Sequence, residues 1–221
     1  MRPVLKFKPR SGCFLKFFGA IFAKNIAVLG KIWYTKMNYF CSANRQGVFG
    51  VRVLGIDPGY AIVGWGVLEY NRNRFTPLAF GAVTTPAKTE FTYRLSKIYT
   101  DVTEIMQQHR PQALSIEKLF FNTNATTAID VAQARGVILL AARQNNIPVF
   151  EYTPLQVKQA VTGYGKADKK QVMELIRRLL NLQKVPRPDD TADALAMAIC
   201  HCHSASSLIF KSALRQTGAG R

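Results

Sequence analysis

The sequence predicts an α/β fold in which a mixed sheet of five strands is flanked by helices, and two observations support this. Three short strand-like runs separated by turn residues come first, between residues 51 and 84. Two more short apolar runs then alternate with helical segments up to about residue 203. Strands joined by hairpins pair antiparallel and strands joined through helices pair parallel, so the sheet is expected to contain both kinds of pair.

Turn residues and hydrophobic periodicity place the boundaries of the elements. Pro58-Gly59-Tyr60 and Asn71–Arg74 are expected turns between the first three strands. His109, Arg110 and Pro111 end the first helix. The expected strands are 51–57, 61–69, 78–84, 113–117 and 148–152. The expected helices are 91–108, 124–145, 154–162, 168–182 and 190–203, the first with Tyr93, Leu95, Ile98, Val102, Ile105 and Met106 on its apolar side.

The charge of the chain points to a polyanionic partner. Its 221 residues include 30 Lys and Arg against 13 Asp and Glu, which gives a net charge of +17. Residues 1–50 hold nine of the basic residues and no acidic one, so the remainder still carries +8. A balance this basic favours nucleic acid or an anionic membrane surface.

The N-terminal 1–50 segment differs from the rest of the chain. Its apolar residues fall near helical spacing, but lysines interrupt them too often for a stable membrane span. It is interpreted as a basic amphipathic surface helix, a targeting segment, or an over-extended translation start with Met37 or a position near Val51 as the true beginning. We favour the last interpretation, because 51–221 reads as a self-sufficient domain with a flexible tail from about residue 205.

The four cysteines do not predict a disulfide framework or a metal site. The tract Cys200-His201-Cys202-His203 ends an apolar helical run, and neighbours on a helix point about 100° apart, so they cannot converge on one ion. We therefore interpret the tract as structural. Without a disulfide framework, a reducing compartment is the default, and a cytoplasmic location is expected.

Acidic residues stand where elements of the predicted sheet begin or end. Asp57 ends the first strand, Glu117 ends the fourth, and Asp189, Asp190 and Asp193 open the last helix. Asp57 could be an ordinary turn residue, and Asp189 and Asp190 could be helix-capping residues. Glu117 ends an apolar run, where an unpaired carboxylate is costly, and Asp193 has small or apolar neighbours, so these two are harder to explain without a function. If folding gathers them, they suit two Mg²⁺ ions and an in-line phosphodiester displacement by water.

Five segments in order resemble the RuvC family of Holliday junction resolvases between about Val51 and His203: RVLGIDPG, SIEKLFF, AQARGVILLAA, VFEYTPLQVKQAVTGYGKADKKQV and DDTADALAMAICHCH. The resemblance implies an RNase H-like fold and a homodimer that makes paired nicks at a four-way DNA junction. It also implies Mg²⁺, with two ions per site and Mn²⁺ as a substitute, and cooperation with the RuvA–RuvB branch-migration complex. By position, the catalytic and metal-binding acids would be Asp57, Glu117, Asp190 and Asp193, and no role follows for Asp189.

Candidate DNA contacts lie in two places, around a glycine-containing loop and shortly after Glu117. Lysines beside Gly163-Tyr164-Gly165 can approach phosphates, although a solvated loop would have the same composition. Phe120 is expected to stack on an unpaired base, with a core role as the alternative. The candidate lysines are Lys158, Lys166, Lys169 and Lys170. For Lys158 and Lys169, the resemblance itself implies DNA binding.

Three other functional classes compete with a junction resolvase. An ATP-handling domain of the actin, Hsp70 and sugar-kinase type also starts with a GIDxG turn, but it needs a second lobe for which the chain has no room. A non-catalytic junction-binding module would not need all four acids. A membrane-associated protein would rest on residues 14–33 alone.

Overall fold

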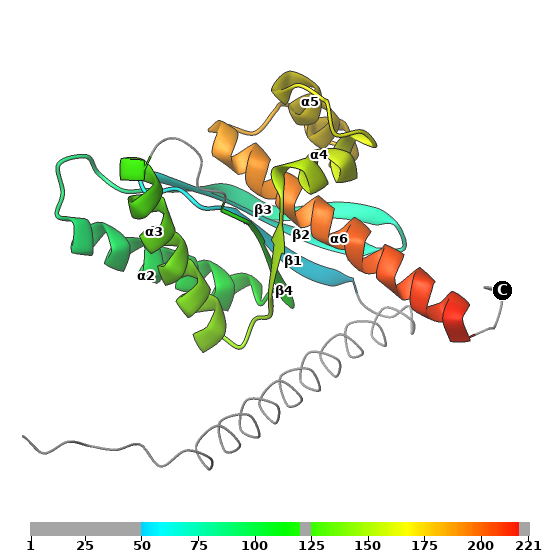
Figure 1. Cartoon of the computed structure of the whole chain (residues 1–221), viewed down its shortest axis with the longest axis horizontal. Coiled ribbons are helices and arrows are strands. Elements are labelled where there is room, and N and C mark those ends of the chain that lie inside the picture. Colours follow the sequence, from blue (N-terminus) through cyan, green and yellow to red (C-terminus); the bar gives the residue numbers. More distant parts are fainter. Residues whose placement is uncertain (1–49, 120–124, 217–221) are drawn as a thin grey trace, which may run out of the picture. The chain divides into compact units, whose positions relative to one another are not determined.

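A computed structural model describes residues 50–119 and 125–216, with side chains for residues 50–119 and 128–205. Five strands form one mixed sheet in the order β3-β2-β1-β4-β5 (Figure 1). The pairs β1–β2 and β2–β3 are antiparallel, and β1–β4 and β4–β5 are parallel. The mixed five-stranded sheet is therefore confirmed. The strands are β1 (Val51–Asp57), β2 (Ile62–Asn71), β3 (Arg74–Thr84), β4 (Ala113–Glu117) and β5 (Val149–Tyr152).

Helices lie close to the predicted positions, with differences at their ends. The last helix continues to Gln216, beyond the expected end at 203. Tyr93 was expected on the apolar side of the first helix, but its side chain is 57% exposed, so that assignment was wrong. The helices are α2 (Phe91–His109), α3 (Ala125–Gln144), α4 (Pro154–Thr162), α5 (Lys169–Leu179) and α6 (Asp189–Gln216).

The largest difference among the strands is the start of β3. It begins at Arg74 rather than at residue 78, because Arg72 and Asn73 form a tight turn with positive φ angles of 47° and 66°. The sequence did not predict that this strand starts before residue 78, because proline at position 77 is unfavourable inside a sheet. Here β3 is an edge strand, where a proline that donates no ladder hydrogen bond is tolerated.

One face of the sheet packs against α2 and α3. Leu54 and Ile56 of β1 lie in one buried cluster with Ile98 of α2 and Ile138 of α3. All four side chains are fully buried. Because side chains alternate along a strand, Val53, Gly55 and Asp57 point to the opposite face.

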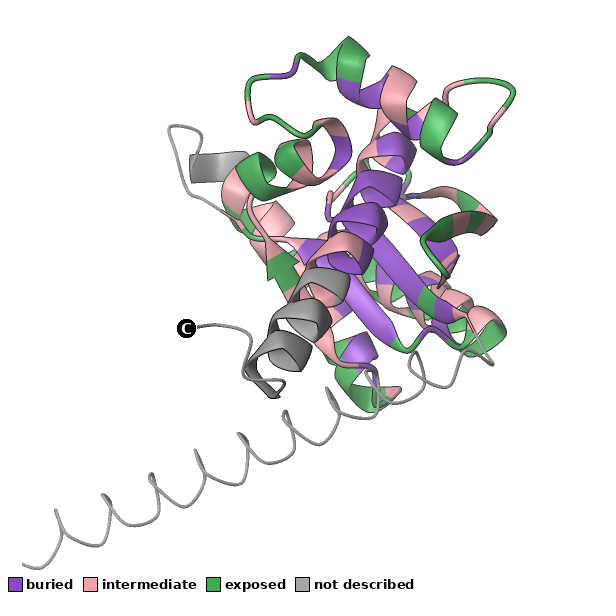
Figure 2. Cartoon of the chain, turned by 90° about the vertical axis from the view of Figure 1, so that its right-hand side faces the viewer, coloured by how far each residue is buried: buried purple, intermediate pink, exposed green. Residues whose placement is uncertain are grey.

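The opposite face packs against α6, which crosses β2, β1 and β4 with a buried middle section (Figure 2). Two glycines allow this close approach. A Cβ on Gly55 would lie 2.0 Å from the carbonyl oxygen of Ala194, and a Cβ on Gly64 would lie 1.9 Å from that of Asp190. The Ser115 hydroxyl donates to the Met197 carbonyl at 2.7 Å and ties α6 to β4.

The Cys200–His203 tract is structural, as predicted. Cys200 and Cys202 are buried thiols. The Nδ1 of His201 is 2.8 Å from the Tyr152 hydroxyl, and the Nδ1 of His203 is 2.9 Å from the Ala160 carbonyl oxygen. These side chains therefore tie α6 to β5 and α4. Within 50–119 and 125–216, none of the helices has the length and apolar character that crossing a membrane requires.

Candidate active site

The ends of β1 and β4 bring two acids to one edge of the sheet. The strands are parallel neighbours, with Gly55 opposite Ser115 and Ile56 opposite Ile116, so Asp57 and Glu117 come next on each. Gly55 and Ser115 both contact α6. With a side-chain period of two, both acids face the same side as α6.

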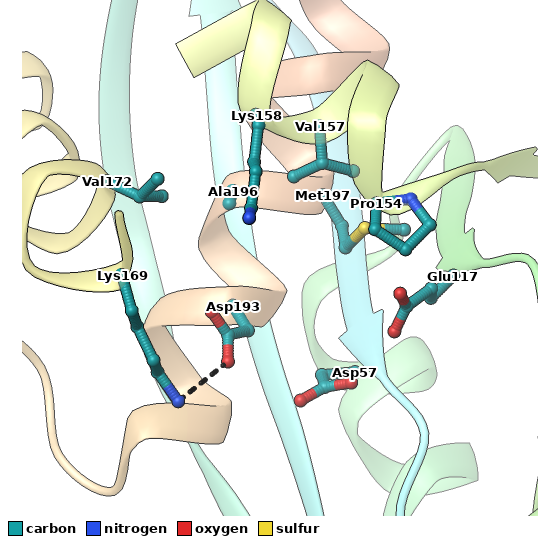
Figure 3. Close-up of a pocket in the computed structure, with 10 residues that line it drawn as sticks. All are labelled: Asp57, Glu117, Pro154, Val157, Lys158, Lys169, Val172, Asp193, Ala196 and Met197. Atoms are coloured by element: carbon teal, nitrogen blue, oxygen red, sulfur yellow. Dashed lines mark ion pairs between the residues drawn. The ribbon is translucent and has the colours of Figure 1, made fainter. Parts of the chain in front are cut away.

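These acids line a pocket of about 280 Å³ between the sheet edge and the helices. Asp193 of α6 lines it too, and Figure 3 shows the three carboxylates turned toward the same space. Lys158 of α4 and Lys169 of α5 enter from the other side. Apolar side chains complete the wall, namely Pro154, Val157, Val172, Ala196 and Met197. The pocket is therefore acidic on the sheet side and basic on the side of α4 and α5.

Three acids at the start of α6 take different positions. Asp193 lines the pocket, whereas Asp190 lies outside its wall and acts through its charge on Asp57 and Asp193. Asp189 pairs with Lys169 at 3.2 Å and also with Arg187. Lys169 is in addition 3.5 Å from Asp193, so its ammonium bridges two acids of α6.

Burial and, after it, mutual repulsion raise the pKa values of the pocket acids. The pKa of Asp57 rises to about 7, mainly because burial disfavours its charged form and further because Asp193, Glu117 and Asp190 are close. Burial followed by the Asp193 charge raises the pKa of Glu117. Burial also raises the pKa of Asp193, although Lys169 partly opposes it. A cation bound among these groups would stabilise their ionised forms.

The chemistry of the donors fits a hard divalent cation. Every acidic group in the pocket offers carboxylate oxygens, the ligands that Mg²⁺ prefers, and burial together with neighbouring acids raises the pKa of each. As the side chains stand, no three His, Cys, Asp or Glu residues of the described chain are already arranged around a single ion position. The acids therefore fit such an ion by type and proximity, and binding would require them to move closer.

The lysines predicted to contact DNA fall into two groups. Lys158 and Lys169 line the pocket, whereas Lys166 and Lys170 are exposed and lie outside its wall. Capping boxes set these positions, because Thr153 caps α4 and Asp168 caps α5. Phe120 lies outside the described residues.

Sequence reasoning missed two arginines that hold the strand ends. Arg94 of α2 is buried, lies 3.5 Å above the ring of Tyr60 and donates to the Thr85 hydroxyl at 2.8 Å. Thr85 in turn donates to the Tyr60 carbonyl at 2.8 Å, in the turn that follows Asp57. Arg135 of α3 donates to the Glu117 carbonyl. Nothing in the local sequence pointed to either contact, because Arg94 and Arg135 both reach residues outside their own helices.

The fold and the site together define a class of protein, the RNase H-like enzymes that cleave phosphodiesters. The features that define it are a mixed sheet covered by α6 and an acidic pocket beside two lysines. A family model described as "Crossover junction endodeoxyribonuclease RuvC" matches residues 53–201. Because this match covers more than half of the chain, the chain belongs to the RuvC family.

Individual relatives agree with this assignment. The crossover junction endodeoxyribonuclease RuvC of Caldanaerobacter subterraneus subsp. tengcongensis is 51% identical over 158 residues, which is 72% of this chain and 96% of the relative. That of Rubrobacter xylanophilus is 56% identical over 152 residues, covering 69% and 85%. A structure of Thermus thermophilus RuvC in complex with Holliday junction substrate is 34% identical, with a TM-score of 0.65 over 71% of this chain and 96% of that one. The likeness to that structure confirms the RNase H-like fold.

Proposed function

We propose that this protein resolves four-way DNA junctions by metal-dependent endonucleolytic cleavage, with Asp57, Glu117, Asp190 and Asp193 as its metal-binding acids. The observation that carries the proposal is the convergence of Asp57, Glu117 and Asp193 on one pocket, with Asp190 close enough to raise the pKa of Asp57. Family membership and the relatives named for this activity support the substrate.

Residues on the two sides of the pocket have different proposed roles. Asp57 and Glu117, anchored at strand ends, would hold the cation from the sheet side, and Asp193 and Asp190 from α6. Two Mg²⁺ ions, for which Mn²⁺ could substitute, would neutralise charge at the scissile phosphate and lower the pKa of the attacking water. Lys158 and Lys169 bind neighbouring phosphates, and Lys169 must leave Asp193 to do so. Lys166 and Lys170 would contact the DNA farther out, and Phe120 would stack on an unpaired base.

Substitution of the strand-end acids tests the site. Asp57→Asn and Glu117→Gln should lower the single-turnover cutting rate of a synthetic four-way junction with Mg²⁺ by at least about 100-fold. Junction affinity measured in EDTA should stay within about twofold, since neither change removes a positive charge. Asp101→Asn, which removes a partly buried acid on α2 that pairs with Lys97, is the matched control and should cut normally. Near-normal cutting by either pocket variant would refute the site assignment.

Two paired cuts call for two sites, and we propose that a C₂ homodimer supplies them. One nick leaves the junction joined through its other strands, whereas two symmetric nicks separate it. In a mixture of wild-type chains with excess Asp57→Asn, mixed dimers should release singly nicked junctions. If the amount of fully resolved product depended only on the amount of wild-type chain, the result would contradict a dimer. Cooperation with RuvA–RuvB is part of the same proposal and is tested by adding that complex to the junction.

The proposed activity resides in residues 51–221, with 1–50 as an extension. Full-length protein and the 51–221 fragment should cut the junction at similar rates in Mg²⁺. A fragment that folds but does not cut would assign a role to the extension. We place the activity in the cytoplasm with the DNA, where the buried thiols of Cys200 and Cys202 suit a reducing environment.

A further inference from the structure

Arg135 of α3 makes two contacts at the point where the chain leaves β4. Its Nε donates to the main-chain carbonyl oxygen of Glu117 at 3.2 Å. Its Nη2 pairs with the carboxylate of Glu151 on β5. The Arg135 side chain is only 14% exposed, whereas Glu151 is 47% exposed, so the contact with the Glu117 carbonyl is the more shielded of the two. A planar guanidinium held at two points has one preferred orientation.

The two contacts bridge the neighbouring strands β4 and β5. Glu151 lies opposite Ile116, and Glu117 lies opposite Tyr152, in the parallel register. The Lys118 amide, one residue beyond the end of β4, still donates to the Tyr152 carbonyl at 2.9 Å. Arg135 therefore fixes the peptide group of Glu117 at the last ladder position, where strand pairing no longer constrains the chain on both sides.

Fixing that peptide group also fixes the direction of the Glu117 side chain. The carboxylate reaches the pocket from a Cα that belongs to the same peptide unit, so a rotation of the unit would turn the carboxylate away from Asp57 and Asp193. Arg135 itself does not line the pocket. Its hydrogen bond to the Glu117 main chain links it to a residue that does.

We propose that Arg135 is a positioning residue of the nuclease reaction, which holds the main chain of Glu117 so that its carboxylate faces the metal-binding pocket. The inference rests on the proposed role of Glu117 and adds the residue that orients it. Arg135 is assigned no contact with the DNA and no contact with the metal.

The test uses full-length Arg135→Ala and Arg135→Lys, with Arg143→Ala as the matched control, since Arg143 is an exposed residue in the last turn of the same helix. Binding of Mn²⁺ alone is measured from the EPR signal of the free ion. Arg135→Ala should weaken Mn²⁺ binding about tenfold and slow single-turnover cutting by a factor of about ten to a hundred. Arg135→Lys should rescue this only partly, because an ammonium cannot form the planar fork. Arg143→Ala should match wild type.

Two other roles for Arg135 predict different results. A purely structural role lowers the melting temperature but leaves Mn²⁺ affinity unchanged at a temperature where the variant is folded. A direct DNA contact weakens junction binding in EDTA and reduces its salt dependence. Either result overturns the proposal, which expects junction affinity and salt dependence within about twofold of wild type.

Combination with Glu117→Gln separates this inference from the proposed function. If Arg135 acts through Glu117, the double variant should bind Mn²⁺ no more weakly than Glu117→Gln alone. Normal cutting by Glu117→Gln refutes the role of Glu117 itself. Loss of cutting by Glu117→Gln together with wild-type behaviour of Arg135→Ala refutes only the role of Arg135. If Arg135→Ala does not fold, Glu151→Gln, which removes the charge partner, should weaken Mn²⁺ binding in the same direction, and unchanged binding would overturn the proposal.

Discussion

The two sides of the pocket are built in different ways. On the sheet side, Asp57 and Glu117 end strands whose preceding residues are fully buried, and arginines hold the main chain beside them. On the helical side, Lys169 is 57% exposed and shares its charge between Asp189 and Asp193. The sheet side is therefore fixed by packing and buried hydrogen bonds, and the helical side by exposed ion pairs that rearrange at little cost.

This difference suits a site that combines chemistry with recognition of a variable polymer. Acids that hold metal ions must keep a fixed geometry, because small displacements reduce affinity and rate. Lysines that follow a phosphate backbone work as mobile point charges. Changes on the sheet side should therefore affect stability and metal binding, whereas changes on the helical side should affect DNA affinity and its salt dependence.

The largest expected effect comes from the acids themselves, as a dependence of stability on pH in the absence of metal. The pKa of Asp57 is about 7 in the folded chain and close to 3.8 when unfolded. Between these values the folded state holds a proton that the unfolded state has released, so stability falls as pH rises from 4 to 7. Three pKa units correspond to about 4 kcal/mol.

Thermal unfolding in EDTA across pH 4–8 measures this slope. Asp57→Asn should be less sensitive to pH than wild type and more stable than wild type at pH 8. Mg²⁺ should restore wild-type stability at high pH, because it binds the ionised carboxylates, and should do so much less for Asp57→Asn. Identical slopes for the two proteins in EDTA would show that Asp57 does not titrate in this way.

The close approach of α6 to the sheet gives the next largest effect. Gly55→Ala places a Cβ 2.0 Å from the carbonyl oxygen of Ala194, and neither backbone can yield without moving α6. Stability should fall by about 3 kcal/mol, with loss of Mn²⁺ binding as Asp193 moves away from Asp57. Chemical denaturation followed by circular dichroism measures the loss.

A second glycine provides the matched control for this change. Gly136 lies within α3, and a Cβ there would meet nothing within 4 Å. Gly136→Ala should raise stability by roughly 0.5–1 kcal/mol through its helix propensity. If Gly55→Ala were tolerated equally well, the packing of α6 on β1 would not be the constraint that positions Asp193.

The same contrast separates what the sequence predicted from what it could not. Strand ends and helix starts are local features, so Asp57, Glu117 and the acids of α6 could be named from turn residues and periodicity. Their convergence required the parallel pairing of β1 with β4, which the local sequence did not specify, because β2, β3 and α2 separate these strands in the chain. The acids of the sheet side could thus be named from the sequence, whereas their juxtaposition depended on the order of the strands.

The helical side and the supporting contacts depended on tertiary packing. Apart from the family resemblance, nothing in the sequence distinguished Lys169, which lines the pocket, from Lys170 beside it, because the choice depends on how α5 is oriented toward α6. Arg135 gave no clear signal either, since its partner Glu117 lies 18 residues away and the contact is to a main-chain oxygen. Interactions with the backbone leave no complementary residue type in the sequence.

The smallest expected effect is on the helical side, where Lys158→Ala should weaken junction binding in EDTA by less than about tenfold. The reason is the loss of one phosphate contact, so the slope of log affinity against log salt should become shallower by about one unit, through counterion release. Stability should change by no more than about 0.5 kcal/mol, because Lys158 makes no ion pair within residues 50–119 and 128–205.

Lys97→Ala on α2 removes an equal charge that is already paired with Asp101, and should leave the slope unchanged. Equal slopes for wild type and Lys158→Ala would remove Lys158 from the DNA contacts, and a large loss of stability would mean that the two sides of the pocket are not built as differently as their contacts indicate.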